Sequence, residues 1–211
     1  MKWVENYKTS LKKKTKWSWI SDIFFIVLII ALLFPTTRTP LIVFLKRVTL
    51  VSPSIPNDAQ YGTLSQSDLQ WTLINKENQF IQLKDLTDKP IFLNIWATWC
   101  APCIAEMPSI EKLYIDYKDD VHFVIASYED ADIINSFLEK QQLNLPVFRY
   151  RSEEPLLLHS KTIPATFIIN TNGEIVLIEK GTSNWNSEKV RSFLDQLRPS
   201  TFFFSSSLSI N

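Results

Sequence analysis

The chain has 211 residues with 22 basic and 22 acidic side chains, and 45% of its residues are hydrophobic. This length suits one globular domain with additional segments, and the balanced charge provides no general attraction for nucleic acid. The three glycines form no nucleotide-binding motif, and two cysteines are too few for a disulfide-rich scaffold.

The first predicted element is a membrane anchor. Residues 1–16 carry six lysines and one glutamate, and residues 17–34 are apolar except for Asp22. As a helix, the apolar run measures about 27 Å, enough to span a hydrocarbon core. Trp17 and Trp19 lie where an aromatic belt is expected. The sequence therefore predicts a single transmembrane helix over residues 17–34.

The distribution of basic residues predicts the orientation of this anchor. The lysine-rich segment 1–16 is expected to stay in the cytoplasm, which places the rest of the chain on the extracytoplasmic (periplasmic) side of the inner membrane. A cleaved signal peptide is the alternative, but no small-x-small cleavage site follows the apolar run, which ends Leu33-Phe34-Pro35. A buried core helix fits less well, because the run is apolar on all faces.

Residues 35–67 are predicted to be a linker, since prolines, threonines and serines are frequent there. Within it, residues 40–51 are too apolar for a free tether. They are expected either to pack on the following domain or to lie in the membrane interface, with Lys46 and Arg47 towards the headgroups. Residues 199–211 are expected to be a frayed C-terminal tail.

Residues 68–198 have the pattern of an α/β domain. Apolar runs of strand length alternate with helical patterns, and turn residues separate them. The predicted elements in chain order are a β-hairpin (71–83), a buried strand (90–96), a helix (101–117), a strand (121–128), a helix (130–142), a strand (146–150), a β-hairpin (165–181) and a closing helix (186–197).

Both cysteines lie in the segment WATWCAPC, between the strand at 90–96 and the following helix. Cys100 falls at the helix N-terminus, where free N–H groups and the helix dipole stabilise a thiolate. It is therefore the candidate nucleophile, and Cys103 is the resolving thiol. Pro102 is tolerated because first-turn positions need no amide donor. A passive disulfide would constrain only a short loop, and a zinc site would lack ligands.

Glu106 follows Cys103 by three residues, so both side chains project from one face of the helix. A carboxylate at this position can exchange protons with the thiols or change their pKa values. The alternative is an ordinary solvated glutamate on the helix surface.

The segment NIWATWCAPCIAEMP, the strand that precedes it and Ile163-Pro164 before a strand hairpin resemble the thioredoxin superfamily. With the apolar N-terminal run and the hairpin ahead of the core, the chain is similar to the TlpA/ResA-type membrane-anchored thiol–disulfide oxidoreductases over residues 68–198. The resemblance implies a thioredoxin fold: a central mixed β-sheet flanked by helices, with an added N-terminal β-hairpin, preceded by the transmembrane helix.

The resemblance also implies roles for particular residues. In the ResA-type pattern C-x-x-C-x-x-E-x-P the glutamate serves the thiols, and Glu106 and Pro108 match it, with Pro108 kinking the helix. Asn94 stands where many thioredoxins have a buried aspartate, which moves the proton-transfer role towards Glu106.

Residues near the second hairpin complete the predicted site. Without the resemblance, Pro164 is simply a proline at a strand entry. With it, Pro164 is expected to be cis and to face the cysteines, so that the backbone of Ile163 pairs with a substrate strand. Trp96 and Trp99 are expected to shape and shield the site.

The sequence thus predicts a membrane-anchored oxidoreductase that reduces protein disulfides outside the cytoplasm, with the Cys100–Cys103 disulfide as its redox centre and no other cofactor or metal. Expected partners are protein thiols and disulfides, a membrane electron donor and the lipid bilayer. Apocytochrome c maturation is one use that the resemblance implies. Alternatives are a disulfide oxidase or isomerase, and a copper metallochaperone that would need His159 or Met107. A peroxiredoxin-like peroxidase fits poorly, because Thr98 lies two residues before the cysteine rather than three.

Overall fold

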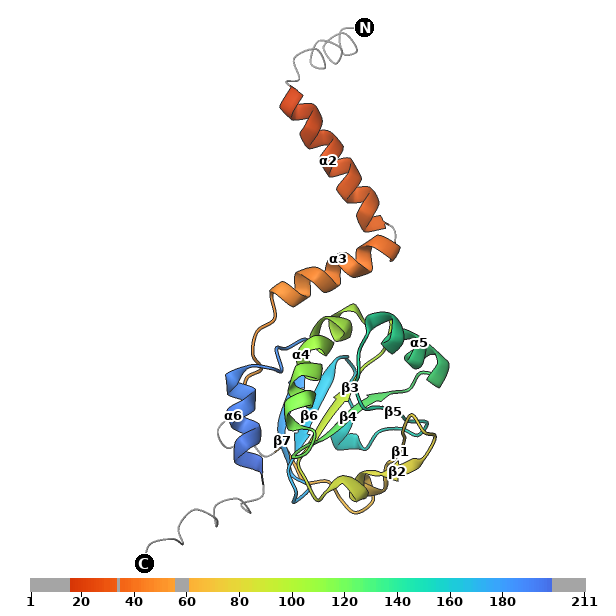
Figure 1. Ribbon diagram of the computed structural model, residues 1–211, viewed down its shortest axis with the longest axis vertical. Helices are drawn as coiled ribbons and strands as arrows, with labels where there is room; N and C mark the ends of the chain where they lie inside the picture. The colour runs from red at the N-terminus through yellow and green to blue at the C-terminus, as the bar shows by residue number, and fades with distance from the viewer. Residues whose placement is uncertain (1–15, 34, 56–60, 199–211) are drawn as a thin grey trace, which may run out of the picture. The chain divides into compact units, whose positions relative to one another are not determined.

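The computed structural model describes residues 16–33, 35–55 and 61–198 (Figure 1). The chain divides into two compact units, residues 1–42 and residues 43–211. Residues 1–15 of the predicted cytoplasmic segment 1–16, and the predicted C-terminal tail 199–211, lie outside the described residues.

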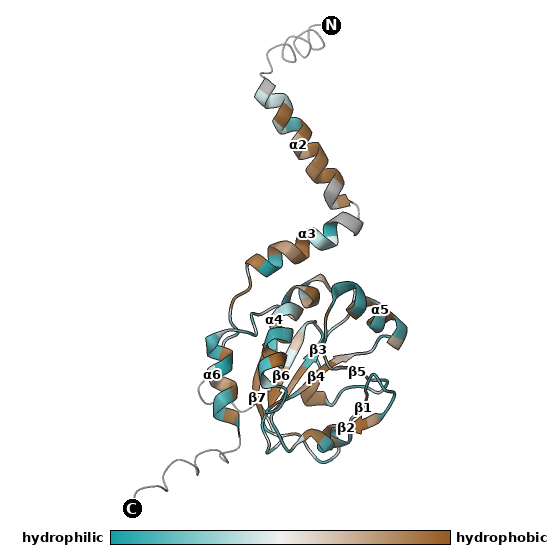
Figure 2. Cartoon of the chain, in the orientation of Figure 1, coloured by the Kyte–Doolittle hydropathy of each residue, from teal (hydrophilic) through white to brown (hydrophobic). Residues whose placement is uncertain are grey.

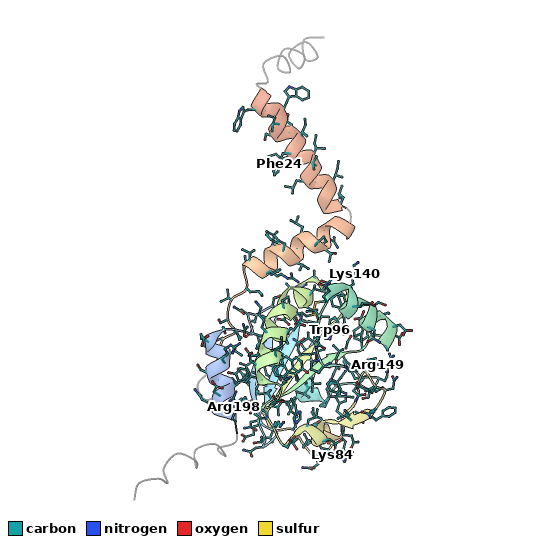
Figure 3. The ribbon with its side chains drawn as sticks, in the orientation of Figure 1. Phe24, Lys84, Trp96, Lys140, Arg149 and Arg198 are labelled. Atoms are coloured by element: carbon teal, nitrogen blue, oxygen red, sulfur yellow. A yellow bond between two sulfur atoms is a disulfide. The ribbon has the colours of Figure 1, made fainter. Side chains whose placement is uncertain are left out.

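The first unit contains helix α2, Lys16–Leu33, which coincides with the predicted anchor except that residue 34 is not described. Large apolar side chains such as Phe24 and Phe25 are exposed along α2, and most of its surface is hydrophobic (Figures 2 and 3). Among the described helices, none meets the combined requirement of length and apolar character for crossing a membrane.

The structure contains a second helix, α3 (Pro35–Val48), where the sequence predicted a linker. The helix includes Pro40, which removes one backbone donor, and it ends with Lys46 and Arg47 in its last turn, where cations are favourable. In the second unit, Val43 is buried against Ile104 and Ala105 of the main domain. Proline content obscured this helix in the sequence.

The domain is built on a seven-stranded mixed sheet with the order β2-β1-β5-β4-β3-β6-β7. The strands are β1 (Thr72–Ile74), β2 (Phe80–Gln82), β3 (Ile91–Ile95), β4 (His122–Ser127), β5 (Val147–Arg149), β6 (Ala165–Ile169) and β7 (Ile175–Lys180). Strands β3, β4 and β5 are parallel, and the remaining pairs are antiparallel. This arrangement confirms the predicted α/β class, with the first hairpin added at one edge.

Helices α4 (Ala101–Tyr117), α5 (Ala131–Gln141) and α6 (Glu188–Leu197) bury side chains in one core cluster on the same face of the sheet. The two crossovers β3-α4-β4 and β4-α5-β5 step across the sheet in the same direction. Because such crossovers are right-handed, both helices pack on one face. Short 3-10 helices and loops contribute to a second cluster, which contains alternate residues of β3 such as Leu93 and Ile95.

The domain starts earlier along the chain than residue 68. The backbone N–H groups of Tyr61 and Leu64 donate to the carbonyl oxygens of Ile175 and Gly173 in the last hairpin, and Leu64 is buried.

In the last hairpin Gly173 has φ +78°, and the side-chain oxygen of Asn170 accepts from two backbone amides of the turn. The predicted Asn172-Gly173 turn is therefore present, and a neighbouring asparagine side chain holds it in place.

Candidate active site

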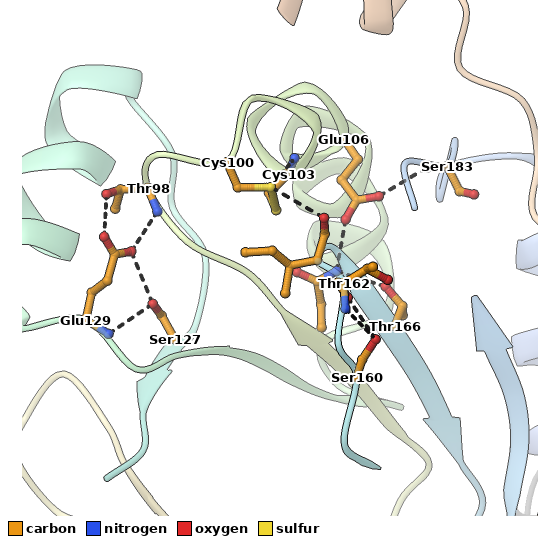
Figure 4. Close-up of a disulfide and its surroundings, with 12 residues drawn as sticks. Thr98, Cys100, Cys103, Glu106, Ser127, Glu129, Ser160, Thr162, Thr166 and Ser183 are labelled. Carbon is orange, nitrogen blue, oxygen red and sulfur yellow. Dashed lines mark hydrogen bonds between the residues drawn. A yellow bond between two sulfur atoms is a disulfide. The ribbon is translucent and has the colours of Figure 1, made fainter. Parts of the chain in front are cut away.

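The two cysteines form a disulfide at the N-terminus of α4, directly after the loop that follows β3 (Figure 4). Cys100 is the N-cap residue, and its Sγ accepts a hydrogen bond from the backbone N–H of Cys103 at 3.3 Å. Pro102 occupies the first turn, where no intrahelical donor is required. The sulfur of Cys100 therefore lies among the free amides of the helix end, which is the environment that favours a thiolate when the pair is reduced.

The cis peptide bond expected from the resemblance is present between Ile163 and Pro164. The carbonyl oxygen of Ile163 lies 3.8 Å from Cys100 Sγ, so the loop before β6 reaches the disulfide from a segment 63 residues away in sequence. Trp99 is 63% exposed next to the nearly buried Cys100. The Ile163 carbonyl and the exposed Trp99 are thus both next to Cys100, where an incoming chain would have to approach.

Trp96 and Pro108 occupy structural positions near the site. Trp96 is fully buried, and its ring packs at 5.3 Å from that of Phe137, so it fills the core beneath the loop and does not meet solvent. Helix α4 continues through Pro108. The next residue, Ser109, donates a hydrogen bond from its hydroxyl to the backbone carbonyl oxygen of Glu106.

Glu106 is completely buried beside the disulfide, on the turn of α4 that follows Cys103 (Figure 4). One carboxylate oxygen accepts from Asn94 Nδ2 at 2.9 Å. The other accepts from the Ser183 backbone N–H and from Trp185 Nε1, each at 3.1 Å. This geometry excludes a solvated helix glutamate at this position.

Burial raises the pKa of Glu106 from 4.5 to about 7. The three hydrogen-bond donors stabilise the charged form and oppose this effect, whereas the nearby charge of Glu179 adds to it. Desolvation is the largest of these influences. A carboxyl group with this pKa can both accept and release a proton near neutral pH.

Asn94 and Thr166 connect Glu106 to the sheet. The two residues are direct partners in the antiparallel pairing of β3 with β6, and Asn94 Nδ2 lies 2.8 Å from the Thr166 hydroxyl. A side-chain amide can rotate to present either its NH₂ group or its oxygen, and a hydroxyl can donate or accept. Asn94 can therefore donate a hydrogen bond to ionised Glu106 or, after a flip, accept a hydrogen bond from the neutral acid.

The partners Ser183 and Trp185 were not identified in the sequence. Both are buried in the segment between β7 and α6, almost 80 residues after Glu106. The same segment is fixed again by a hydrogen bond from the Trp185 backbone N–H to the hydroxyl of Ser109. No local sequence pattern predicts these contacts. The Ser183 donor is a backbone N–H, which nearly every residue has, and the Trp185 indole meets Glu106 only in the folded chain.

A second carboxylate, Glu129, also escaped the sequence analysis. It follows β4 and accepts from the backbone N–H of Thr98 at 2.6 Å and from the Thr98 hydroxyl at 2.7 Å. The hydroxyl of buried Ser127 contacts the same carboxylate at 3.3 Å. Glu129 thus holds the loop that presents Trp99 and Cys100. Its position at the carboxyl end of a parallel strand beside β3 was the available signal.

His159, which the copper alternative requires, has Nδ1 at 3.4 Å from a Glu154 carboxylate oxygen. No group of three metal-ligating side chains occurs in the part of the chain that the structure describes. The groups around the Cys100–Cys103 disulfide are backbone amides and a buried carboxyl group.

A family model described as Redoxin matches residues 54–197, which is more than half of the chain. The chain belongs to the redoxin family. The match covers the sheet, the cysteines, Glu106 and the segment that contains Ser183 and Trp185.

Relatives of this redoxin carry the name thiol-disulfide oxidoreductase ResA. The protein from Oceanobacillus iheyensis is 34% identical over 137 residues, which cover 63% of this chain and 70% of the relative. The protein from Halalkalibacterium halodurans is 28% identical over 145 residues, which cover 67% and 81%. These relatives confirm the predicted TlpA/ResA type and the enzyme class, thiol–disulfide oxidoreductase.

The redoxin fold is also similar to solved structures. A secreted disulfide oxidoreductase of Mycobacterium tuberculosis, homologous to DsbE of Escherichia coli, has a TM-score of 0.51 and 21% identity. The match covers 63% of this chain and 100% of that one. At this identity the likeness supports the thioredoxin-like fold of the redoxin domain.

Proposed function

We propose that this thiol–disulfide oxidoreductase acts as a reductant of protein disulfides outside the cytoplasm. The observation that carries the proposal is the closed Cys100–Cys103 disulfide beside a buried carboxyl group on the same helix, whose pKa burial raises to about 7. Such a group supplies the proton transfers that each cycle of thiol exchange requires, without contact with bulk water.

In the proposed cycle, the reduced enzyme presents Cys100 as a thiolate at the N-terminus of α4. The thiolate attacks one sulfur of the target disulfide and forms a mixed disulfide, and the other target sulfur leaves as a thiolate and takes up a proton from water. Cys103 then loses its proton to Glu106 and attacks Cys100 Sγ. The Cys100–Cys103 bond closes, and the second target sulfur leaves as a thiolate. It is protonated as Glu106 releases its proton, so that two electrons and two protons pass to the target and Glu106 returns to its initial state.

The proposed substrate is an extended polypeptide segment that contains a disulfide. The backbone of Ile163, beside the cis-proline and close to Cys100 Sγ, is the candidate partner for its main chain. Exposed Trp99 is the candidate apolar contact. The cysteine pair of apocytochrome c, reduced before haem attachment, is the target class that we favour among those compatible with this site.

The proposed location is the outer side of the cytoplasmic membrane, with a membrane protein as electron donor. The support is in the sequence: the lysine-rich segment 1–16 precedes the apolar run 17–34, and most of the described apolar side chains of that run are exposed. Alkaline extraction of membranes from cells, followed by protease treatment of intact spheroplasts, tests this location. Full-length protein that is extracted by alkali, or that is protected from external protease, would contradict it.

The reduction potential of the Cys100–Cys103 pair tests the direction of electron flow. The oxidised protein is equilibrated with dithiothreitol or glutathione buffers, and the reduced fraction is measured by thiol labelling. A value near that of thioredoxin, about −270 mV, or lower supports a reductant. A value near that of DsbA, about −120 mV, would instead favour an oxidase and contradict the proposal.

A further inference from the structure

One side of α3 and of the chain just after it is apolar, and none of the residues that the structure describes covers it. Phe44, Leu45 and Val48 are 63%, 55% and 71% exposed, and Val51 is 73% exposed. Residues 44, 45 and 48 lie on one side of the helix, because residue 48 is four positions from 44 and three from 45, and such positions are neighbours on a helix surface. Four large apolar side chains exposed in a span of eight residues indicate a surface that another phase or molecule covers.

The charge of this region indicates what kind of surface covers the apolar face. No aspartate or glutamate occurs between Ile23 and Asn57, whereas Arg38, Lys46 and Arg47 lie within that stretch. Lys46 and Arg47 are exposed, and neither forms an ion pair with any other described residue. An apolar helix face flanked by unpaired cations is the pattern of a segment that lies in an anionic lipid interface.

Within the second unit, residues 43–48 of α3 pack on the redox domain through the side opposite to this face. Val43 is buried with Ile104 and Ala105 of α4, and Ala101, the residue between Cys100 and Pro102, packs against the same cluster. Beyond the helix, the Val51 carbonyl accepts from the backbone N–H of Asn184, in the segment that also binds Glu106. This part of α3 is therefore a component of the domain surface, and it lies over the first two turns of the helix that begins at the disulfide.

We infer that the face formed by Phe44, Leu45, Val48 and Val51 inserts into the interface of an anionic phospholipid bilayer. The inserted face keeps the N-terminal end of α4, and hence the disulfide, close to the membrane surface. The substrate class follows from this position: disulfides presented at the bilayer, by membrane-bound or membrane-emerging chains, are reached before those of freely diffusing proteins. The inference rests on the proposed location at a membrane, and the experiment below tests the two separately.

The experiment measures the depth of single nitroxide labels on the full-length chain. Cys100→Ser and Cys103→Ser remove the only two cysteines, so a new cysteine at one position carries the label uniquely. Phe44→Cys, Leu45→Cys and Val48→Cys sample the apolar face, and Arg47→Cys samples the polar side of the same helix. Phe25→Cys, in α2, is the control for the anchor, and Ile115→Cys, exposed on α4, is the control for the domain surface.

Each variant is reconstituted in vesicles of phosphatidylcholine with and without phosphatidylglycerol, and collision with oxygen is compared with collision with a water-soluble nickel chelate. The expected result is a ratio of oxygen to nickel collisions several-fold higher at 44, 45 and 48 than at 47 and 115. The ratios at 44, 45 and 48 should fall without phosphatidylglycerol, and also in the Lys46→Glu, Arg47→Glu background, where position 115 is the reference.

Three results would overturn the inference. Labels at 44, 45 and 48 that collide freely with nickel, while the label at 25 is lipid-exposed, would leave the anchor intact and exclude insertion of α3. Labels at 44, 45 and 48 that are shielded from both reagents in either lipid would mean that protein covers this face. Equal ratios at 44, 45, 47 and 48 would exclude an oriented helix. Lipid exposure at these three positions with a water-exposed label at 25 would support the inference and contradict the anchor.

Discussion

Two glutamates flank the disulfide, and the same chemical group performs different tasks on the two sides. Glu106 lies beside the cysteines on α4, fully buried, and accepts three hydrogen bonds from Asn94, Ser183 and Trp185. Glu129 is half-buried beside the loop and binds the amide and the hydroxyl of Thr98. Desolvation brings Glu106 into the neutral pH range, where it can move protons. Glu129 instead fixes the backbone of the loop. The degree of burial and the hydrogen-bond partners of each glutamate therefore determine what its carboxylate does.

The largest expected effect on thiol exchange comes from replacing the cysteines that lie between the two glutamates. Cys100→Ser should abolish thiol exchange, because the attacking thiolate is absent, whereas Cys103→Ser should accumulate a mixed disulfide that cannot be resolved. Non-reducing electrophoresis after incubation with a disulfide-bonded peptide distinguishes the two variants. Equal behaviour of both would reverse or remove the assigned roles.

Glu106→Gln should slow the resolving step by about 10²-fold at pH 7, because an amide cannot take the proton from Cys103. The side chain can still be accommodated, since a flipped Asn94 accepts from the new NH₂ group while Thr166 donates. Stopped-flow exchange rates between pH 5 and 9 measure the effect. The pH dependence near 7 should disappear in the variant. A profile identical to that of the unmodified protein would restrict Glu106 to packing.

Burial of Glu106 also predicts how stability depends on pH. Between pH 4.5 and about 7 the unfolded chain loses this proton while the folded chain retains it, so the free energy of unfolding falls as pH rises. A shift from 4.5 to about 7 corresponds to a decrease of about 3 kcal/mol, complete above pH 7. Urea unfolding at several pH values measures it. Glu106→Gln should remove most of this slope, and a slope that persists in the variant would assign it to other groups.

Glu129→Gln should have a smaller and different effect. The carboxylate has two short hydrogen bonds to Thr98, and replacement by an amide weakens both, at a cost of about 1–2 kcal/mol in the free energy of unfolding. Exchange should slow modestly while its pH profile keeps the form set by Glu106. Thr98→Val is the matched control, because it removes only the hydroxyl contact. Disappearance of the titration near pH 7 in Glu129→Gln would break the distinction between the two glutamates.

The smallest predicted effect concerns Glu179, which pairs with Thr166 in the β6–β7 register and whose charge raises the pKa of Glu106. Glu179→Gln should lower the pKa of Glu106 by less than about one unit, because the residue is half-buried and partly screened. A carboxyl infrared or NMR titration of Glu106 would detect the shift. A rise in that pKa would have the wrong sign for the proposed repulsion.

The sequence alone determined much of this protein. Alternating and continuous apolar runs predicted all seven strands and the three helices of the domain, because periodicity records which side chains face a core. The C-x-x-C motif at a strand-to-helix junction, with Glu106 three residues on, predicted the candidate site. The helix α3 was missed, because its prolines and threonines are also typical of a linker.

The tertiary structure decided which groups surround those residues. Glu106 was open to a solvated interpretation until the segment after β7 placed Ser183 and Trp185 around it. Glu129 acquired a function only through the parallel pairing of β3 with β4, which brings it to Thr98. Both contacts join residues distant in sequence, and one of the donors to each carboxylate is a backbone amide. Local pattern records the periodic burial of a chain, but only the folded chain determines which distant donors meet a buried charge.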